Sequence, residues 1–256
     1  MRWKYAGVSL VGTSHVSRNI PCQDAWNILV LSNGTLIAAV ADGLGSASNA
    51  EDGAKAACEF SVNYLEQRMR KKTWLRKSTH YFPPRGQDAE TVLRDTFAKT
   101  REHLHTIADK ESLALSDLAC TLMVAVVTDK HWYTLHIGDG AIVGVYDKTV
   151  KTISPPEQGE YVNVVTPLTS ARYLEELRYH HGTDKFTGIA LMSDGIEALA
   201  ISYKTKDAHP GFFIPLMQLM ELKETNEVVE NLTQQFDTRG REIVDDDMTL
   251  VVAYRK

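Results

Sequence analysis

Cysteine is scarce in this sequence of 256 residues, and the few cysteines it has are widely spaced. The three are Cys22, Cys58 and Cys120, an odd number with no CxxC pair. This pattern argues against a disulfide framework and against a thiolate metal site. We therefore expect a protein of a reducing compartment, with a cytoplasmic location.

Long apolar runs and an excess of basic residues are also missing. The longest apolar stretch, residues 118–127, is interrupted by Thr121 and is far shorter than the about 20 residues that cross a bilayer. Residues 1–20 contain no continuous apolar segment, so neither a secretory signal nor a membrane association is expected. Lys and Arg number 28 against 33 Asp and Glu, a net charge of −5, which argues against a nucleic-acid partner.

Three common binding motifs are absent as well. Gly43-Leu44-Gly45 begins like a dinucleotide fingerprint, but Ser48 stands where the third glycine would be. No phosphate-binding GxxxxGK[ST] loop and no HExxH zinc motif occurs. Nucleotide and zinc chemistry are therefore not expected.

Short apolar runs bounded by turn residues predict a protein rich in β-structure. Strands are expected at residues 5–10, 27–31, 36–41, 119–127, 131–137, 141–146, 150–153, 188–192 and 248–254. Apolar spacings of three and four predict helices over 54–65 and 93–107, with a further helical region around 229–236. Ser48 and Glu51 fit a capping box at the start of the first helix.

This order of elements predicts an α+β layered sandwich more readily than an alternating parallel βαβ fold. No repeat and no flexible linker divides the sequence, so we expect one domain over residues 1–256. Residues 154–186 carry prolines and polar residues and fit no strand or helix pattern; we expect an inserted flap there.

Aspartates stand next to four of the predicted strands. Asp42, Asp139 and Asp194 each follow an apolar strand, and Asp246 comes just before the last one. Strand ends of one sheet can converge, and carboxylates that converge repel each other unless a cation lies between them. Hard divalent ions such as Mg²⁺ and Mn²⁺ take oxygen ligands, so the set favours one of them over zinc. Asp-Gly is also a common turn dipeptide, and any single one of these aspartates is weak support.

As an ordered set, these motifs resemble a known family. The set comprises Gln23-Asp24, Ala41-Asp42-Gly43, Ala119-Cys120-Thr121, Gly138-Asp139-Gly140, Ser193-Asp194-Gly195 and Asp246-Asp247-Met248-Thr249. It is similar to the metal-dependent Ser/Thr protein phosphatases of type 2C, in their short bacterial branch. The resemblance implies a β-sandwich of two antiparallel sheets flanked by helices on both faces. It also implies a site for two Mn²⁺ or Mg²⁺ ions, with a third ion left open.

The resemblance also implies residue roles. The metal ligands would be Asp42, the carbonyl of Gly43, Asp194 and Asp246, with Asp42 bridging both ions. Asp139 matches the acid of a third, weaker metal site, and Asp24 matches the acid of the N-terminal motif; both are assigned to the catalytic machinery. The arginine that binds phosphate in many relatives has no clear match, and His15 and Arg18 are the candidates. The implied partner is a phosphoprotein, the substrate of a Ser/Thr kinase.

The sequence departs from the family pattern near this site, with a mild change at Asp247, which replaces a frequent asparagine, and larger changes at two other positions. Gln23 replaces a common glutamate, and Leu44 replaces a histidine that some relatives have as a proposed general acid. Three functions therefore remain open: a Ser/Thr protein phosphatase, a regulatory pseudophosphatase that binds phosphoproteins, and a hydrolase of small phosphoesters.

Overall fold

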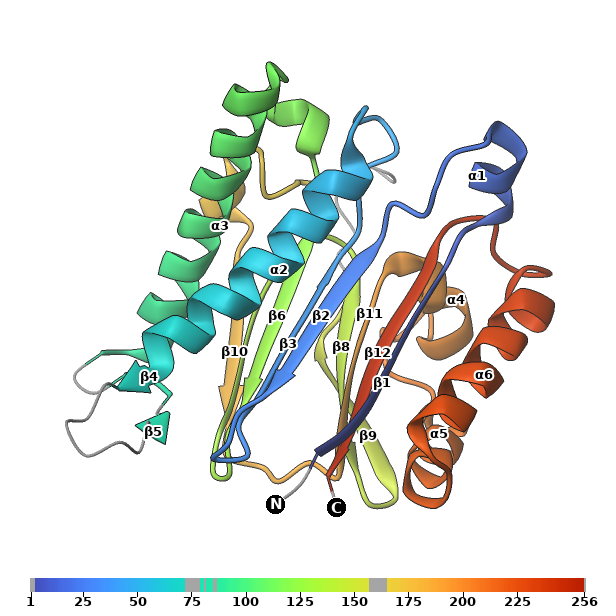
Figure 1. The fold of residues 1–256 in the computed structure, drawn as a ribbon. Helices are drawn as coiled ribbons and strands as arrows, with labels where there is room; N and C mark the ends of the chain where they lie inside the picture. The colour runs from blue at the N-terminus through green and yellow to red at the C-terminus, as the bar shows by residue number, and fades with distance from the viewer. Residues whose placement is uncertain (1–2, 72–78, 81, 85–86, 157–164, 256) are drawn as a thin grey trace.

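Two antiparallel sheets stack face to face in the computed structural model, which describes residues 3–71, 79–80, 82–84, 87–156 and 165–255 (Figure 1). The first sheet runs in the order β1 (Trp3–Leu10), β12 (Met248–Arg255), β11 (Gly188–Met192), β8 (Ala141–Tyr146) and β9 (Thr149–Ser154). The second runs β10 (Arg178–Gly182), β7 (Trp132–Ile137), β6 (Leu122–Val127), β3 (Leu36–Ala41) and β2 (Ala25–Val30). A short hairpin, β4 (Arg70–Lys71) and β5 (Thr79–His80), stands apart.

Helices cover both outer faces of the sandwich. α2 (Ala50–Met69) and α3 (Ala89–Glu111) pack on the second sheet, and α5 (Pro210–Leu222) and α6 (Thr225–Gln235) pack on the first (Figure 1). The shorter elements are α1 (Thr13–Arg18), α4 (Glu197–Ala200), the 3-10 turns η1 (Leu115–Leu118), η2 (Tyr173–Glu175) and η3 (Asp194–Ile196), and a π-helical turn, Phe236–Gly240. The expected α+β sandwich of two antiparallel sheets flanked by helices is confirmed.

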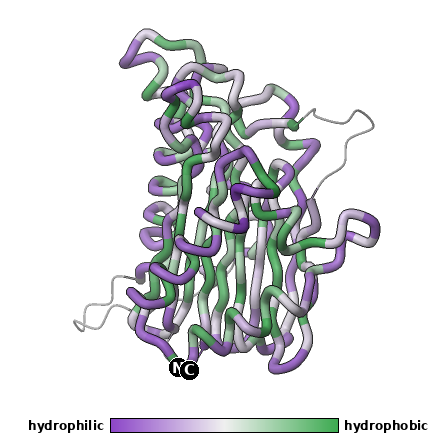
Figure 2. Tube along the Cα trace, turned by 90° about the vertical axis from the view of Figure 1, so that its right-hand side faces the viewer, coloured by the Kyte–Doolittle hydropathy of each residue, from purple (hydrophilic) through white to green (hydrophobic). Residues whose placement is uncertain are grey.

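The apolar core has three layers because both sheets are covered on both faces. All six residues of β3 and all six of β6 are buried, as expected for continuous apolar runs in the middle of a sheet. Side chains from both sheets fill the space between them, and each outer layer joins one sheet to its pair of helices. In Figure 2 the hydrophobic stretches accordingly follow the strands.

The first and last strands are neighbours. β1 pairs with β12 along its whole length, from Trp3 opposite Arg255 to Leu10 opposite Met248. Both ends of the chain therefore lie at the same end of the sandwich, away from α1 (Figure 1).

The expected flap over 154–186 is only partly a separate segment. β10 pairs with β7 as the edge of the second sheet, and Leu168, Leu177 and Phe186 are buried. Residues 157–164 lie outside the described part of the chain. The β10 sequence, RYHHG, has no apolar alternation, so hydrophobicity alone did not mark it as a strand.

The expected capping box at α2 is wrong. The helix begins at Ala50 after Asn49, and neither Ser48 nor Asn49 caps it with a side chain. Instead, the Ser48 hydroxyl donates to Oδ1 of Asn49 at 3.0 Å.

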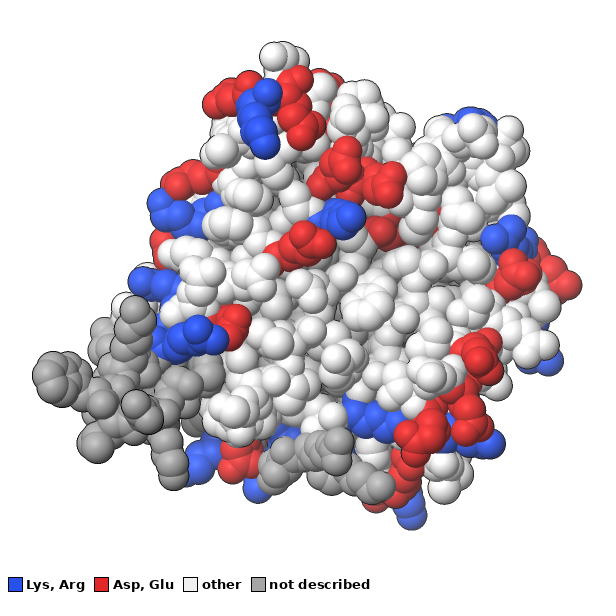
Figure 3. All heavy atoms as spheres, viewed as in Figure 1, with Lys and Arg blue, Asp and Glu red and all other residues white. Residues whose placement is uncertain are grey.

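Acidic and basic side chains are interspersed over the face that carries α2 and α6, with no broad field of one sign (Figure 3). Within the described residues, no helix has the length and apolar character needed to cross a bilayer.

Candidate metal centre

The four aspartates that stand beside the apolar strands converge on one cleft at the α1 end of the sandwich. Asp42 directly follows β3, Asp139 follows β7, Asp194 follows β11, and Asp246 lies two residues before β12. The cleft has a volume of about 240 Å³. Its lining includes these four aspartates together with Ser14, His15, Arg18, Gly43, Leu44, Gly45, Thr121 and Val165.

Three of the aspartates form a tight cluster. One carboxylate oxygen from each of Asp42, Asp139 and Asp194 lies within 4.8 Å of the others. Burial, followed by the charges of Asp139 and Asp246, raises the pKa of Asp194 to about 7. Burial, followed by the charges of Asp24 and Asp194, also raises the pKa of Asp42 well above its usual value. Without a cation, the ionised carboxylates of this cluster repel one another, and the fold keeps them close together despite that repulsion.

The donor set fits a hard divalent cation. All the acidic groups offer oxygen, and within the described residues Oδ1 of Asp139 is buried without a hydrogen-bond partner. The amide oxygen of Gln23, buried near Gly45, also has no partner there. A bound cation would both satisfy such oxygens and favour the ionised carboxylates.

Asp246 belongs to a second, adjoining group. It lies with His15 and Asp247, whose potential ligand atoms are also within 4.8 Å of one another. Asp246 is exposed, and its Oδ1 accepts a hydrogen bond of 2.8 Å from the backbone N–H of Asp247. The structure thus brings Asp246 to the same cleft as the three clustered acids.

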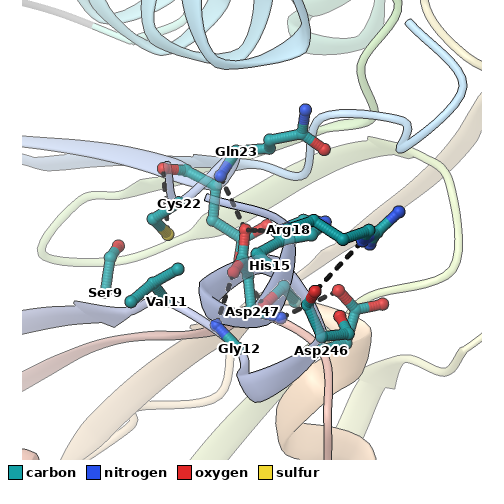
Figure 4. A network of polar contacts seen from close by, with 12 residues as sticks. Ser9, Val11, Gly12, His15, Arg18, Cys22, Gln23, Asp246 and Asp247 are labelled. Carbon is teal, nitrogen blue, oxygen red and sulfur yellow. Dashed lines mark hydrogen bonds and ion pairs between the residues drawn. The ribbon is translucent and has the colours of Figure 1, made fainter. Parts of the chain in front are cut away.

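Asp247 is the structural centre of this end of the site, as Figure 4 shows. Its two carboxylate oxygens accept from the backbone N–H of Gly12 at 2.7 Å and of Gln23 at 2.6 Å. The second oxygen also lies 3.0 Å from Nδ1 of His15. Asp247 therefore joins three segments and fixes the His15 ring through one nitrogen, which leaves Nε2 as the other polar atom of the ring. Sequence reasoning missed this role, although the run of three aspartates before β12 pointed to the position.

Asp24 lies behind the cleft and is not part of its lining. It is 8% exposed, and its Oδ2 accepts from the Ser193 hydroxyl at 2.6 Å. The same hydroxyl accepts from the backbone N–H of Thr249 at 3.0 Å. Burial raises the pKa of Asp24 well above its usual value. The contacts of Asp24 thus brace the residue that precedes Asp194.

Thr121 fixes the backbone of Asp42. Its hydroxyl accepts from the N–H of Asp42 at 2.9 Å, and its own N–H donates to the carbonyl of Asp42 at 2.8 Å. Gly43 follows in a crowded position, where a Cβ atom would lie 2.7 Å from the carbonyl oxygen of Gln23 and 2.8 Å from Cβ of Ala50. Glycine is therefore required next to Asp42.

Arg178 is a further residue that sequence reasoning missed. From β10, its guanidinium donates to the carbonyl of Pro155 at 2.7 Å and to the carbonyl of Gly138. It also lies 3.1 Å from Nδ1 of His136, whose pKa burial and the Arg178 charge hold well below its usual value. Arg178 thus holds the turn that carries Asp139. No sequence signal marks it, because residue 178 lies far from Asp139 along the chain.

Comparisons with known proteins identify the family of this chain. The family model for protein phosphatase 2C matches residues 11–237. The chain is 28% identical to serine/threonine-protein phosphatase 3 of Escherichia coli, over 99% of this chain and 98% of that protein. Among solved structures, the phosphatase PstP/Ppp of Mycobacterium tuberculosis superposes with a TM-score of 0.66 at 17% identity, covering 99% of each chain. Stp1 of Staphylococcus aureus gives a TM-score of 0.66 at 14% identity, covering 100% of this chain and 96% of that one. The chain belongs to the protein phosphatase 2C family.

Proposed function

We propose that this protein is a metal-dependent serine/threonine protein phosphatase, which hydrolyses phosphoserine and phosphothreonine. The observation that carries the proposal is the cleft in which Asp42, Asp139 and Asp194 converge beside His15 and Arg18. Clustered carboxylates suit divalent cations, and adjacent basic groups suit a phosphate.

We assign two Mn²⁺ or Mg²⁺ ions to this cleft. Asp42, the carbonyl of Gly43, Asp194 and Asp246 would hold them, and Asp139 would serve a third, weaker ion. The assignment is supported by the position of all five residues on the cleft wall. Bound divalent cations supply activation of water at neutral pH and neutralisation of phosphoryl charge.

The basic residues of the cleft would hold the phosphoryl group. His15 is buried and its Nδ1 is held by Asp247, so Nε2 would donate a hydrogen bond to a phosphoryl oxygen in the doubly protonated ring. Arg18 is exposed, and its Nε donates to the carbonyl of Ser14 at 3.0 Å, which leaves the terminal nitrogens of the fork for the substrate. Asp24 would act from behind the cleft, because its hydrogen bond with Ser193 keeps the neighbouring Asp194 in place.

The proposed substrate is a phosphoprotein made by a Ser/Thr kinase. We further propose a cytoplasmic location, because the three cysteines are free, as expected in a reducing compartment. We also propose that residues 1–256 act as a single domain, since both sheets contribute strand ends to the same cleft.

The test is hydrolysis of a phosphothreonine peptide with Mn²⁺, with EDTA as the metal-free arm. We expect turnover with Mn²⁺ and none with EDTA, and Asp194→Asn should lower kcat by at least about 100-fold because it removes a ligand charge. Asp129→Asn is the matched control, since Asp129 is exposed in the turn between β6 and β7, at the far end of β7 from Asp139.

Two outcomes would overturn the proposal. Binding of the phosphopeptide without turnover would favour the pseudophosphatase function. Faster hydrolysis of small aryl phosphates than of phosphopeptides, compared by kcat/KM, would favour the small-phosphoester hydrolase.

A further inference from the structure

A second cavity lies between α5, α6 and the π-helical turn Phe236–Gly240, among residues distinct from those that line the metal cleft. Its volume is about 550 Å³, within the range of roughly 300–1,000 Å³ typical of small-molecule sites. Leu216, Leu232 and Phe236 are buried in its wall, and Phe212 and Leu219 are partly exposed to it. Apolar side chains therefore form one part of the wall, beside the polar side chains of Asn231, Gln235 and Arg239.

One cation borders this apolar space. Arg239 lines the cavity and is exposed, and within the described part of the chain no carboxylate forms an ion pair with it. The neighbouring Asp237 is paired with Arg241 at 3.0 Å. Arg239 is thus a fixed-charge donor at the edge of an apolar cavity.

The start of α5 has a backbone carbonyl that lacks its helical donor. Pro215 lacks an N–H group, so the carbonyl of Gly211 has no donor from the residue four positions later. Both residues line the cavity. The two polar side chains of α6 on the wall pair with each other, since the Gln235 amide group donates to Oδ1 of Asn231 at 2.7 Å. The charged group on this wall is the guanidinium of Arg239.

We propose that this cavity binds a small amphipathic carboxylic acid. Its apolar body would fill the space lined by Leu216, Leu232 and Phe236, and its carboxylate would pair with the guanidinium of Arg239. An apolar body is required because these three buried side chains offer no polar partner, and an anionic head is required because Arg239 retains its charge at any physiological pH. The two parallel hydrogen bonds of an Arg–carboxylate pair would also fix the orientation of the ligand.

The cavity wall is connected to the metal centre along the chain. The π-helical turn ends at Gly240, whose carbonyl accepts from Val244 at 2.9 Å, and the next residues carry Asp246 and Asp247. Arg241 reaches the carbonyl of Val11 at 3.2 Å, just before the segment that contains His15. A ligand in the cavity would therefore contact the turn from which the Asp246 loop starts.

The test is titration calorimetry of the full-length protein with octanoate, with octan-1-ol as the uncharged probe of the same chain length. We expect octanoate to bind with a stoichiometry of one and at least tenfold more tightly than octan-1-ol. Arg239→Gln should remove that preference while leaving octanol binding unchanged.

Gly211→Leu provides a blocking variant that keeps the fold. A Cβ atom at Gly211 meets no atom within 4 Å, so the leucine side chain can enter the cavity without a clash at its base. We expect at least a tenfold loss of octanoate affinity. Gln218→Leu adds the same side chain at an exposed position of α5 outside the cavity lining and should leave the affinity unchanged. Absence of octanoate binding, equal binding of the two probes, or binding unaffected by Gly211→Leu would each overturn the proposal.

Discussion

Asp42, Asp139 and Asp194 in the metal cleft, and Asp24 behind it, are less stable in their ionised form in the folded chain than in water. Burial is the largest cause for Asp24, Asp42, Asp139 and Asp194 alike, and like charges add to it. An acid whose pKa is raised by folding binds more protons in the folded state than in the unfolded state. The free energy of unfolding must therefore fall as the pH rises through this range.

This sign gives a pH prediction for the metal-free protein. The contribution of these acids to the free energy of unfolding should be greatest below the usual aspartate pKa of about 3.9. For Asp194 it should decline as the pH rises, until the pH passes the folded-state pKa of about 7. The measurement is urea unfolding in EDTA at pH 5, 6 and 7. Asp194→Asn should flatten the decline, whereas a stability that rises over this window in both proteins would contradict a carboxylate origin of the pH dependence.

Arg178 allows a second prediction for a single residue. Arg178→Ala should weaken Mn²⁺ binding severalfold, because the carbonyl of Gly138 loses its donor and the turn holding Asp139 loosens. Gly138 has φ +115°, and a Cβ atom there would overlap the Thr121 side chain. A residue with a side chain therefore cannot replace Gly138 in this turn. Calorimetric titration with Mn²⁺ measures the effect.

Arg178→Lys should recover part of the affinity, since an ammonium group can still donate to one carbonyl. Arg172→Ala, in an exposed ion pair with Glu175 near β10, should bind Mn²⁺ as the native protein does. An unchanged Mn²⁺ affinity in Arg178→Ala would mean that Arg178 does not hold Asp139 in place for metal binding.

For single residues, the sequence predicts the charged groups of the cleft better than it predicts the residues that hold those groups in place. The convergence of Asp42, Asp139 and Asp194 could be expected because each follows an apolar run, a pattern visible along the chain. Asp247 and Arg178 act through backbone groups of distant segments, and such pairing depends on the folded geometry alone.

At the scale of elements, the packing of α2 against η1 depends on the close approach of Gly53 to the backbone of Leu118. A Cβ atom at Gly53 would overlap the carbonyl of Leu118, lying 2.7 Å from its carbon. Gly53→Ala should lower the free energy of unfolding by about 1–3 kcal/mol through overpacking, although alanine favours helices by about 1 kcal/mol. Chemical denaturation measures the change.

Gly211→Ala is the matched control in α5. A Cβ atom there meets nothing within 4 Å, and we expect a neutral effect or a gain of up to about 1 kcal/mol. Equal effects of the two substitutions would mean that the contact between α2 and η1 can relax.

Elements with a strong period were predictable, and elements without one were not. The apolar spacing of α3 and the continuous apolar runs of β3 and β6 define them without tertiary context. β10 is a polar edge strand whose pairing with β7 depends on long-range contacts. α5 is apolar on most sides and contains Pro215, so no amphipathic period identified it.

For the whole molecule, the candidate metal centre joins the two sheets. Asp42 and Asp139 follow strands of the second sheet, whereas Asp194 and Asp246 flank strands of the first. Mn²⁺ at 1,000 times its dissociation constant should raise the free energy of unfolding by about 4 kcal/mol. The measurement is denaturation with Mn²⁺ and with EDTA.

Hydrogen exchange gives the spatial readout of this prediction. Mn²⁺ should slow exchange in the segments after both β3 and β11, since one site restrains both sheets. Slower exchange after only one of these strands would confine the metal to one sheet.

The pairing of β1 with β12 has a consequence for how the protein is made. A ribosome produces β1 before β12, so β1 lacks its neighbour until all the residues between the two strands have been made. Asp246 and Asp247 emerge just before that late strand, and until then His15 lacks the carboxylate that holds it. A nascent chain therefore cannot assemble the cleft before β12 has been made.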